Sequence, residues 1–109
     1  MKIENVPYSV NDWNAIAPTE HAGTTGTALW RTVEMGNLRV RVVELSPGYM
    51  ADHWCARGHV VFVLEGEVTS ELSDGSSSVL KPGMGYLVAD DASSHRSFTA
   101  AGAKILIVD

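Results

Sequence analysis

The sequence predicts an all-β fold. Gly and Pro turn signals recur at intervals of roughly 8 to 10 residues, the spacing typical of a β-sandwich or barrel. Between the turns lie runs rich in β-branched residues, and no long segment repeats its apolar residues with a helical period. The runs predict strands at residues 38–45, 59–65, 68–72, 77–80, 86–89, 97–100 and 105–108.

The N-terminal part of the chain differs in composition from the rest. Residues 1–27 are rich in Gly, Thr, Pro and Asn, and we expect an irregular arm with one short turn near residues 12–16. At 109 residues and 11.7 kDa the chain is large enough to bury one core and too small for two. We therefore expect a single domain over residues 1–109, with the β-barrel at residues 28–109.

Alternation along two strands predicts which side chains share a face. The strand at residues 59–65 is apolar on both faces, which predicts burial on both. In the strand at residues 38–45, the apolar side chains of Leu38, Val40 and Val42 alternate with Arg39 and Arg41. We expect the apolar set to face the core and the arginines to face solvent, with binding of an anionic ligand as the alternative.

Composition excludes several classes of partner and location. The formal net charge of -5 argues against a nucleic-acid or anionic-membrane partner, because both select basic surfaces. The longest apolar run, at residues 60–64, is far shorter than the roughly 20 residues of a membrane helix. The first residues hold no apolar stretch of a secretory signal, and the single Cys55 cannot form an internal disulfide. These features predict a cytoplasmic protein.

Three of the four histidines and the cysteine follow a suggestive pattern. His53 and Cys55 are two residues apart, so on a strand they would project from one face. His59 follows a short turn, and His95 opens a distant strand-like run. Imidazole and thiolate are ligands of Zn, Fe, Cu and Ni rather than of Mg or Ca. The alternative is a set of surface histidines and an inert buried cysteine.

The segment at residues 47–67 resembles the first motif of the cupins. In that family a Gly precedes a His-x-His pair, which is followed by a Glu and, after six residues, by a second Gly. Here His53 matches the first His and Gly66 the closing Gly, whereas Cys55 stands at the second His and His59 at the Glu.

The second cupin motif is matched more loosely. Residues 81–83, Lys-Pro-Gly, open it, two later positions are substituted, and His95 comes one residue late. The resemblance covers residues 28–109. The tetrad Asp-His-Trp-Cys at residues 52–55 is similar to a subgroup of small single-domain bacterial-type cupins.

The resemblance implies a single-domain jelly-roll β-barrel with a metal near one mouth. His53, Cys55, His59 and His95 would then hold one divalent transition metal, with Zn expected first and Fe, Ni or Cu as alternatives. The usual cupin set of three His and one Glu carries one negative charge, and so does this set when Cys55 binds as thiolate. A Cys55 that lies near the metal without binding it is the other possibility.

Five further residues are candidates for the surroundings of the site. Asp52 is positioned either to orient a ligand histidine or to form a turn. Val61, Val63, Tyr86 and Phe98 are candidates to line the pocket. No set of nucleophile and base is evident in the sequence, so we assign no catalytic residue.

Two classes of function follow from this pattern. The first is a metal-dependent enzyme that acts on a small molecule by dioxygenase-, isomerase- or lyase-type chemistry. The second is a non-enzymatic module, either with a closed structural zinc site or with a barrel that binds a small-molecule ligand. Small cupins usually pair through their sheets, so the resemblance also implies a homodimer.

Overall fold

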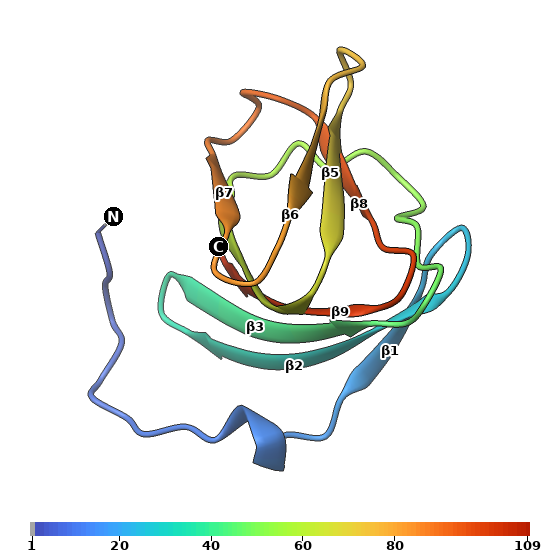
Figure 1. The fold of residues 1–109 in the computed structure, drawn as a ribbon. Helices are drawn as coiled ribbons and strands as arrows, with labels where there is room; N and C mark the ends of the chain where they lie inside the picture. Colours follow the sequence, from blue (N-terminus) through green and yellow to red (C-terminus); the bar gives the residue numbers. More distant parts are fainter. Residues whose placement is uncertain (1) are drawn as a thin grey trace.

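The computed structural model describes residues 2–109, which form two antiparallel β-sheets with a short 3-10 helix, η1, in the N-terminal arm (Figure 1). No helix in this part of the chain is long and apolar enough to cross a membrane. The all-β prediction is confirmed. The elements are η1 (Trp13–Ala15), β1 (Thr19–Ala22), β2 (Thr27–Met35), β3 (Leu38–Leu45), β4 (His59–Gly66), β5 (Val68–Leu72), β6 (Ser77–Leu80), β7 (Gly85–Val88), β8 (His95–Phe98) and β9 (Ala103–Val108).

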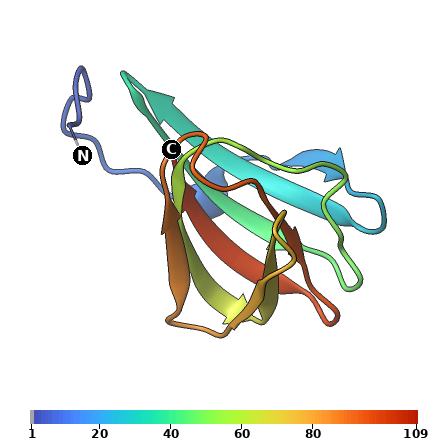
Figure 2. The same ribbon diagram turned by 90° about the horizontal axis from the view of Figure 1, so that it is seen from above.

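The two sheets face each other and enclose the core. The larger sheet has the strand order β1-β2-β3-β9-β4-β7 and the smaller has the order β6-β5-β8. Figure 2 shows the long strands β2, β3 and β9 running side by side across the molecule. In the larger sheet the last strand, β9, lies between β3 and β4, and this crossover is typical of a jelly-roll barrel.

Most predicted strands are confirmed, and two observed strands were not predicted. The predictions for β3, β5 and β6 match the observed bounds, and those for β4, β7, β8 and β9 differ by one or two residues. Strand β1 lies in the expected arm and pairs with β2. Strand β2 was missed because its alternation is broken on both faces, with Arg31 on one face and Thr32 and Glu34 on the other.

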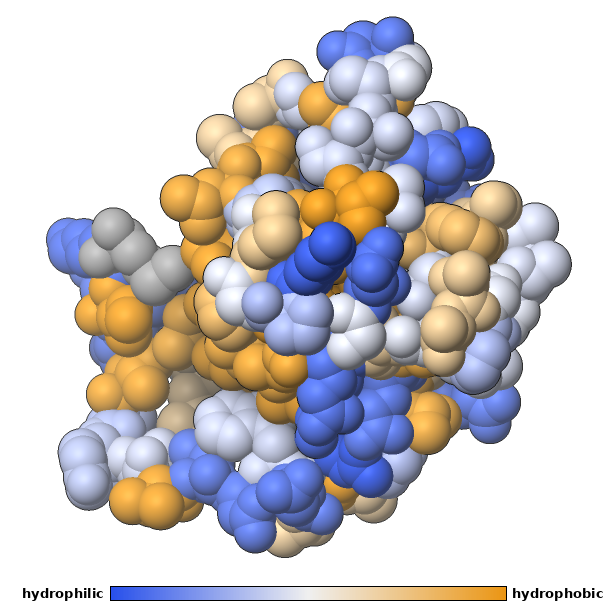
Figure 3. All heavy atoms as spheres, in the orientation of Figure 1, coloured by the Kyte–Doolittle hydropathy of each residue, from blue (hydrophilic) through white to orange (hydrophobic). Residues whose placement is uncertain are grey.

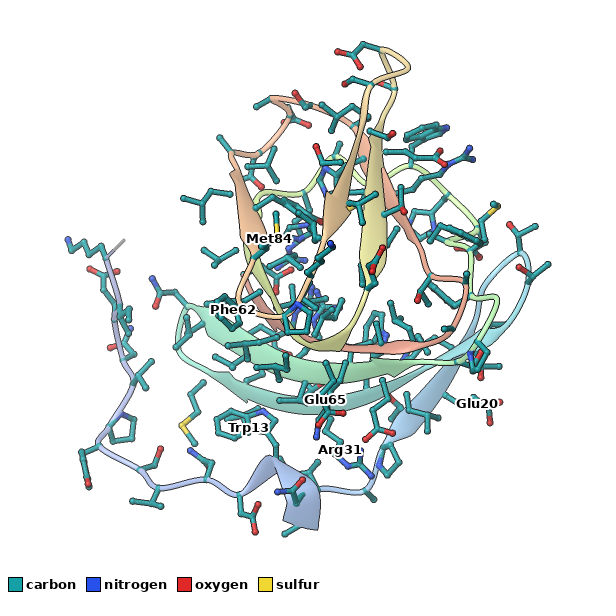
Figure 4. The ribbon with its side chains drawn as sticks, in the orientation of Figure 1. Trp13, Glu20, Arg31, Phe62, Glu65 and Met84 are labelled. Atoms are coloured by element: carbon teal, nitrogen blue, oxygen red, sulfur yellow. The ribbon has the colours of Figure 1, made fainter. Side chains whose placement is uncertain are left out.

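The expected orientation of β3 is wrong. Arg39 and Arg41 face the barrel interior together with Val43, and Arg41 is only 6% exposed. The opposite, apolar face of β3 is covered by the N-terminal arm, where the Trp13 indole donates a hydrogen bond to the Val40 carbonyl at 3.1 Å (Figure 4). An arm that shields the outer face allows an apolar row to lie there, so alternation alone could not identify the inner face.

Strand β4 is buried on one face only, which corrects the prediction of burial on both. Val61 and Val63 are 3% and 0% exposed, whereas Phe62 and Leu64 on the opposite face are 40% and 39% exposed. Leu87 on the adjacent strand β7 is 79% exposed. Figure 3 shows apolar side chains gathered on this side of the molecule.

The hydrophobic core lies between the two sheets. It is formed by buried aliphatic side chains, namely Ala28, Val43, Leu45, Val61, Val63, Val68, Leu80 and Ile105. At the end of β4 the chain turns through Gly66, whose φ of +76° favours glycine. A Cβ at this position would collide with the Gly102 carbonyl, so the closing Gly of the motif has a steric cause.

Candidate metal centre

Three potential metal-binding side chains converge inside the barrel. Cys55, His59 and His95 each offer one donor atom, and these atoms all lie within 4.8 Å of one another. His59 opens β4 and His95 opens β8, so the two sheets contribute one histidine each. Two nitrogens and a sulfur form a donor set suited to a transition metal.

The backbone holds Cys55 beside His95. The amide of Cys55 donates to the His95 carbonyl at 2.8 Å, and the amide of His95 donates to the Cys55 carbonyl at 2.9 Å. This reciprocal pair forms an isolated antiparallel bridge in the long connection between β3 and β4. Residues paired in this way have their side chains on the same side of the ladder, so the bridge positions the sulfur and the imidazole together.

The two buried histidines direct their Nε2 atoms at each other. The distance between His59 Nε2 and His95 Nε2 is 2.8 Å. His95 Nδ1 lies 2.8 Å from the Ser93 carbonyl, which can only accept, so Nδ1 carries the proton. In the neutral ring the lone pair of His95 is therefore on Nε2, the atom that faces His59.

The environment of His59 fits the same arrangement. Burial lowers the pKa of His59, and a positive charge on His95 would lower it further, so the His59 imidazole is neutral near pH 7. Its Nδ1 has no hydrogen-bond partner among residues 2–109 and lies 3.7 Å from the Asp109 carboxylate. A proton on Nδ1 would face this carboxylate and leave the Nε2 lone pairs of both rings directed at one point. In this arrangement the Nε2 atoms of His59 and His95 can both bind one cation.

Tyr86 completes the inner wall beside the histidines. Its hydroxyl lies 3.1 Å from His59 Nε2, and its ring packs edge-on to His95. Burial raises the pKa of Tyr86 far above its ordinary value, so the phenol stays protonated at physiological pH. Tyr86 is therefore a neutral hydroxyl at the donor cluster, able to donate or accept one hydrogen bond.

His53 lies apart from the other three candidates. The side chain of His53 is 75% exposed, and its Nδ1 contacts the Asp52 carboxylate at 2.6 Å. Residues 52 and 53 form a bend, so the extended strand expected to place His53 and Cys55 on one face is interrupted. His53 lines the rim of the cavity but is outside the cluster of converging donors. Asp52 contacts His53 and none of the other three candidates.

A cavity of about 290 Å³ opens beside the donor cluster. Val61 and Tyr86 line it, as expected, whereas Val63 and Phe98 are not among the lining residues. Val63 belongs to the core below the cavity. The other lining side chains are largely apolar, and they include Trp30, Val43, Leu45, Tyr49, Ile105 and Ile107.

Next to His59 the cavity wall carries an arginine cluster, which includes the Arg39 and Arg41 that the sequence analysis expected to face solvent. The side chain of Asp109 is 1% exposed and accepts two hydrogen bonds from Arg39, at 2.8 and 2.9 Å, and one from Arg41 at 3.0 Å. Arg57 approaches the same carboxylate at 3.3 Å. Ile105, Ile107 and Asp109 occupy every second position from β9 onward and all line the cavity. This alternation in the sequence could have predicted that Asp109 faces inward.

Arg41 is held flat against an aromatic ring. Its guanidinium carbon lies 4.4 Å from the centroid of the Trp30 ring, and His21 stacks on Trp30 with a centroid separation of 3.7 Å. Cation–π stacking restricts the guanidinium without consuming its N–H donors. Arg41 Nε is buried and has no hydrogen-bond partner in the described part of the chain.

Comparison with known proteins supports the fold more strongly than any one activity. No protein-family model matches the chain, and no curated protein matches its sequence. Solved structures do match in three dimensions. A predicted oxalate decarboxylase from Thermotoga maritima is 17% identical with a TM-score of 0.78, and the match covers 92% of this chain and 96% of that protein.

Two further structures extend the comparison. A protein with a cupin-2 domain from Shewanella frigidimarina is 20% identical with a TM-score of 0.61, over 73% of this chain and 78% of the other. The iron(II) form of HppE, with an alternative substrate, is 19% identical with a TM-score of 0.73, over 94% of this chain and 60% of the other. These likenesses confirm a cupin-type jelly-roll fold.

Proposed function

We propose that this protein is a metal-dependent enzyme that acts on a small molecule, with Cys55, His59 and His95 as the ligands of one divalent transition metal. The observation that carries the proposal is the convergence of these donors within 4.8 Å, at the wall of a cavity lined by apolar side chains. The likeness to the iron(II) form of HppE supports a metal in this fold. Zinc is our first expectation, with Fe, Ni and Cu as alternatives.

The proposed roles of the protein groups follow from their positions. A bound metal would polarise a carbonyl or carboxylate, or activate a bound water or dioxygen. The apolar lining excludes bulk water and strengthens electrostatic interactions in the cavity. The Tyr86 hydroxyl holds a proton beside the donor cluster, and Asp109 places a negative charge 3.7 Å from His59 Nδ1.

The number of donors favours an enzyme over a structural zinc module. Structural zinc sites have four protein ligands, whereas catalytic sites have three and leave a position for water or substrate. His53, which the sequence predicts as a fourth ligand, would have to leave Asp52 and turn inward to close the shell. The structural-zinc alternative therefore depends on His53 alone.

The test is the metal content of protein purified without chelators. We expect about one transition metal ion per chain in the wild-type protein. Cys55→Ser and His95→Asn should each lose most of it, because each removes one of three donors. In Co²⁺-substituted protein, Cys55→Ser should also lose the near-ultraviolet absorption that arises from thiolate ligation.

His53→Asn is the matched control, since it removes a histidine from the rim of the same cavity. Retention of metal in this variant supports the site with an open position. Loss of metal would instead support the closed, structural alternative. Unchanged metal content and Co²⁺ spectrum in both Cys55→Ser and His95→Asn would refute the proposed ligand set.

We also propose that a second copy of this chain covers the apolar side of β4 and β7. Phe62, Leu64 and Leu87 are exposed there, and β7 is an edge strand of the larger sheet. An open edge beside exposed apolar side chains favours association. A cytoplasmic location stays a prediction from the single cysteine, whose thiol must remain reduced to bind a metal.

A further inference from the structure

The cavity wall next to His59 carries more positive than negative side-chain charge. Arg39, Arg41 and Arg57 surround the single carboxylate of Asp109. Arg57 is 56% exposed and is screened by solvent, but Arg39 and Arg41 are 22% and 7% exposed. Among the side chains of Arg39, Arg41 and Asp109 alone, one positive charge is in excess, within a protein whose formal net charge is -5.

The hydrogen bonds of Asp109 are distributed unequally between the two buried arginines. Arg39 binds the carboxylate through two nitrogens, whereas Arg41 contributes only one, Nη2. Arg41 Nε is buried without a partner among residues 2–109, although the whole side chain is only 7% exposed. An unpaired buried donor on a charged group is costly, and a buried charge normally has its own counter-charge.

Arg41 is also held in one place. The Trp30 ring covers one face of its guanidinium, and Asp109 fixes one nitrogen. Guanidinium remains charged at any physiological pH, although burial lowers the pKa of Arg41. A fixed, charged and incompletely paired guanidinium at a cavity wall is a preformed anion receptor.

We propose that Arg41 is a binding residue for the carboxylate of a small organic acid, which occupies the cavity with its apolar part against Trp30 and Val43. A carboxylate with an apolar body fits this cavity, because Arg39, Arg41 and Arg57 share the one side-chain carboxylate of Asp109 and apolar side chains such as Trp30 and Val43 line the same cavity. The volume of about 290 Å³ limits the ligand to a small molecule.

This inference deepens the proposed function by naming the substrate class of the same cavity. It rests on the proposed function for the reaction only. Arg41 and the donor cluster both line the cavity but share no side chain, so carboxylate binding is testable in protein that holds no metal.

The experiment compares benzoate with benzamide, which have the same shape and differ in charge. Metal is removed from the full-length protein with a chelator, and both compounds are titrated by calorimetry. We expect benzoate to bind at least about tenfold more tightly than benzamide, since the charged pair adds a charge-assisted hydrogen bond. Addition of benzoate should also shift the Nε–H resonance of Arg41, a signal that requires no variant.

Substitutions test the assignment to Arg41. Arg41→Gln should abolish the preference for benzoate, and Arg41→Lys should retain part of it, because lysine keeps the charge without the planar donor fork. Arg31→Gln is the matched control: Arg31 lies on β2, pairs with Glu44 and does not line the cavity. It should leave the preference unchanged. Thermal unfolding of each variant establishes that it is folded, and the wild-type comparison remains decisive if Arg41→Gln is not.

The outcomes separate the two proposals. Equal affinity for benzoate and benzamide in metal-free wild-type protein, or an unmoved Arg41 Nε–H resonance, would overturn the inference. A preference found only after metal is restored, and retained in Arg41→Gln, would overturn it as well, because the metal would then hold the carboxylate. A protein that takes up no metal but shows the Arg41-dependent preference would support the inference while refuting the proposed metal site.

Discussion

Replacement of Asp109 by Asn should destabilise the protein more than any other removal of a single charge. Asp109 is the only carboxylate that contacts Arg39 and Arg41 in the described part of the chain, and its side chain is 1% exposed. Asn preserves the shape of the side chain but removes its charge. The guanidinium groups of Arg39 and Arg41, which are 22% and 7% exposed, would then lie together without this counter-charge.

The expected magnitude follows from the burial of this cluster. Removal of one partner from a buried ion pair costs about 3–5 kcal/mol, since it leaves an uncompensated charge. The Asn carbonyl still accepts a hydrogen bond, so we expect the lower end, about 3 kcal/mol. For a domain of this size, that loss lowers the melting temperature by roughly 12 to 24 °C.

The assay is urea and thermal unfolding of metal-free protein, followed by circular dichroism. Glu44→Gln is the control, because Glu44 pairs with Arg31 while 44% exposed. Such an exposed pair contributes at most about 1 kcal/mol. If Asp109→Asn changes the free energy of unfolding by no more than Glu44→Gln does, the cluster is not the buried charge centre described above.

Two further predictions concern acid stability and association. Burial raises the pKa of Asp109, but the Arg39 hydrogen bond and the charges of Arg41 and Arg39 outweigh it, so the pKa lies below its ordinary value. The ionised Asp109 carboxylate therefore stabilises the folded protein fully above about pH 4, and this stabilisation is lost as the pH falls through the lowered pKa. Over this pH range the urea midpoint should fall in the wild-type protein and much less in Asp109→Asn. Leu87→Glu, on the apolar side of β4 and β7, should convert a dimer into a monomer in light scattering; a wild-type monomer would contradict the proposed association.

The strands were predictable where alternation and turns agreed. Strand β3 lies between turn signals and is rich in β-branched residues, so its bounds were predicted correctly although its alternation breaks at Val42 and Val43. In strand β2 the polar residues Arg31, Thr32 and Glu34 interrupt the alternation. In the folded protein Arg31 pairs with Glu44, and the other two side chains are partly or fully exposed, which the sequence alone does not show. The orientation of β3 depends on an arm more than twenty residues away in sequence, and a local pattern does not contain that information.

The site was predictable as a set of residue types but not as a geometry. The resemblance identified Cys55, His59 and His95 as candidates, and the structure brings these three together. It also proposed His53, but a bend at residues 52 and 53 directs that ring toward Asp52. The contacts of Asp109 with arginines about seventy residues earlier in the chain arise only from the placement of β9 beside β3.

The buried charges of the barrel are better explained by ligand binding than by folding. Replacement of a buried ion cluster by apolar residues of similar volume often leaves the stability of a protein unchanged or raises it. Arg39, Arg41 and Asp109 nevertheless occupy inward positions in a barrel whose other walls are largely aliphatic and aromatic. Arg41 in addition leaves one buried donor unpaired. A ligand that brings one negative charge to the Arg41 guanidinium would balance the excess side-chain charge, so the same arrangement that weakens the free protein would bind a carboxylate.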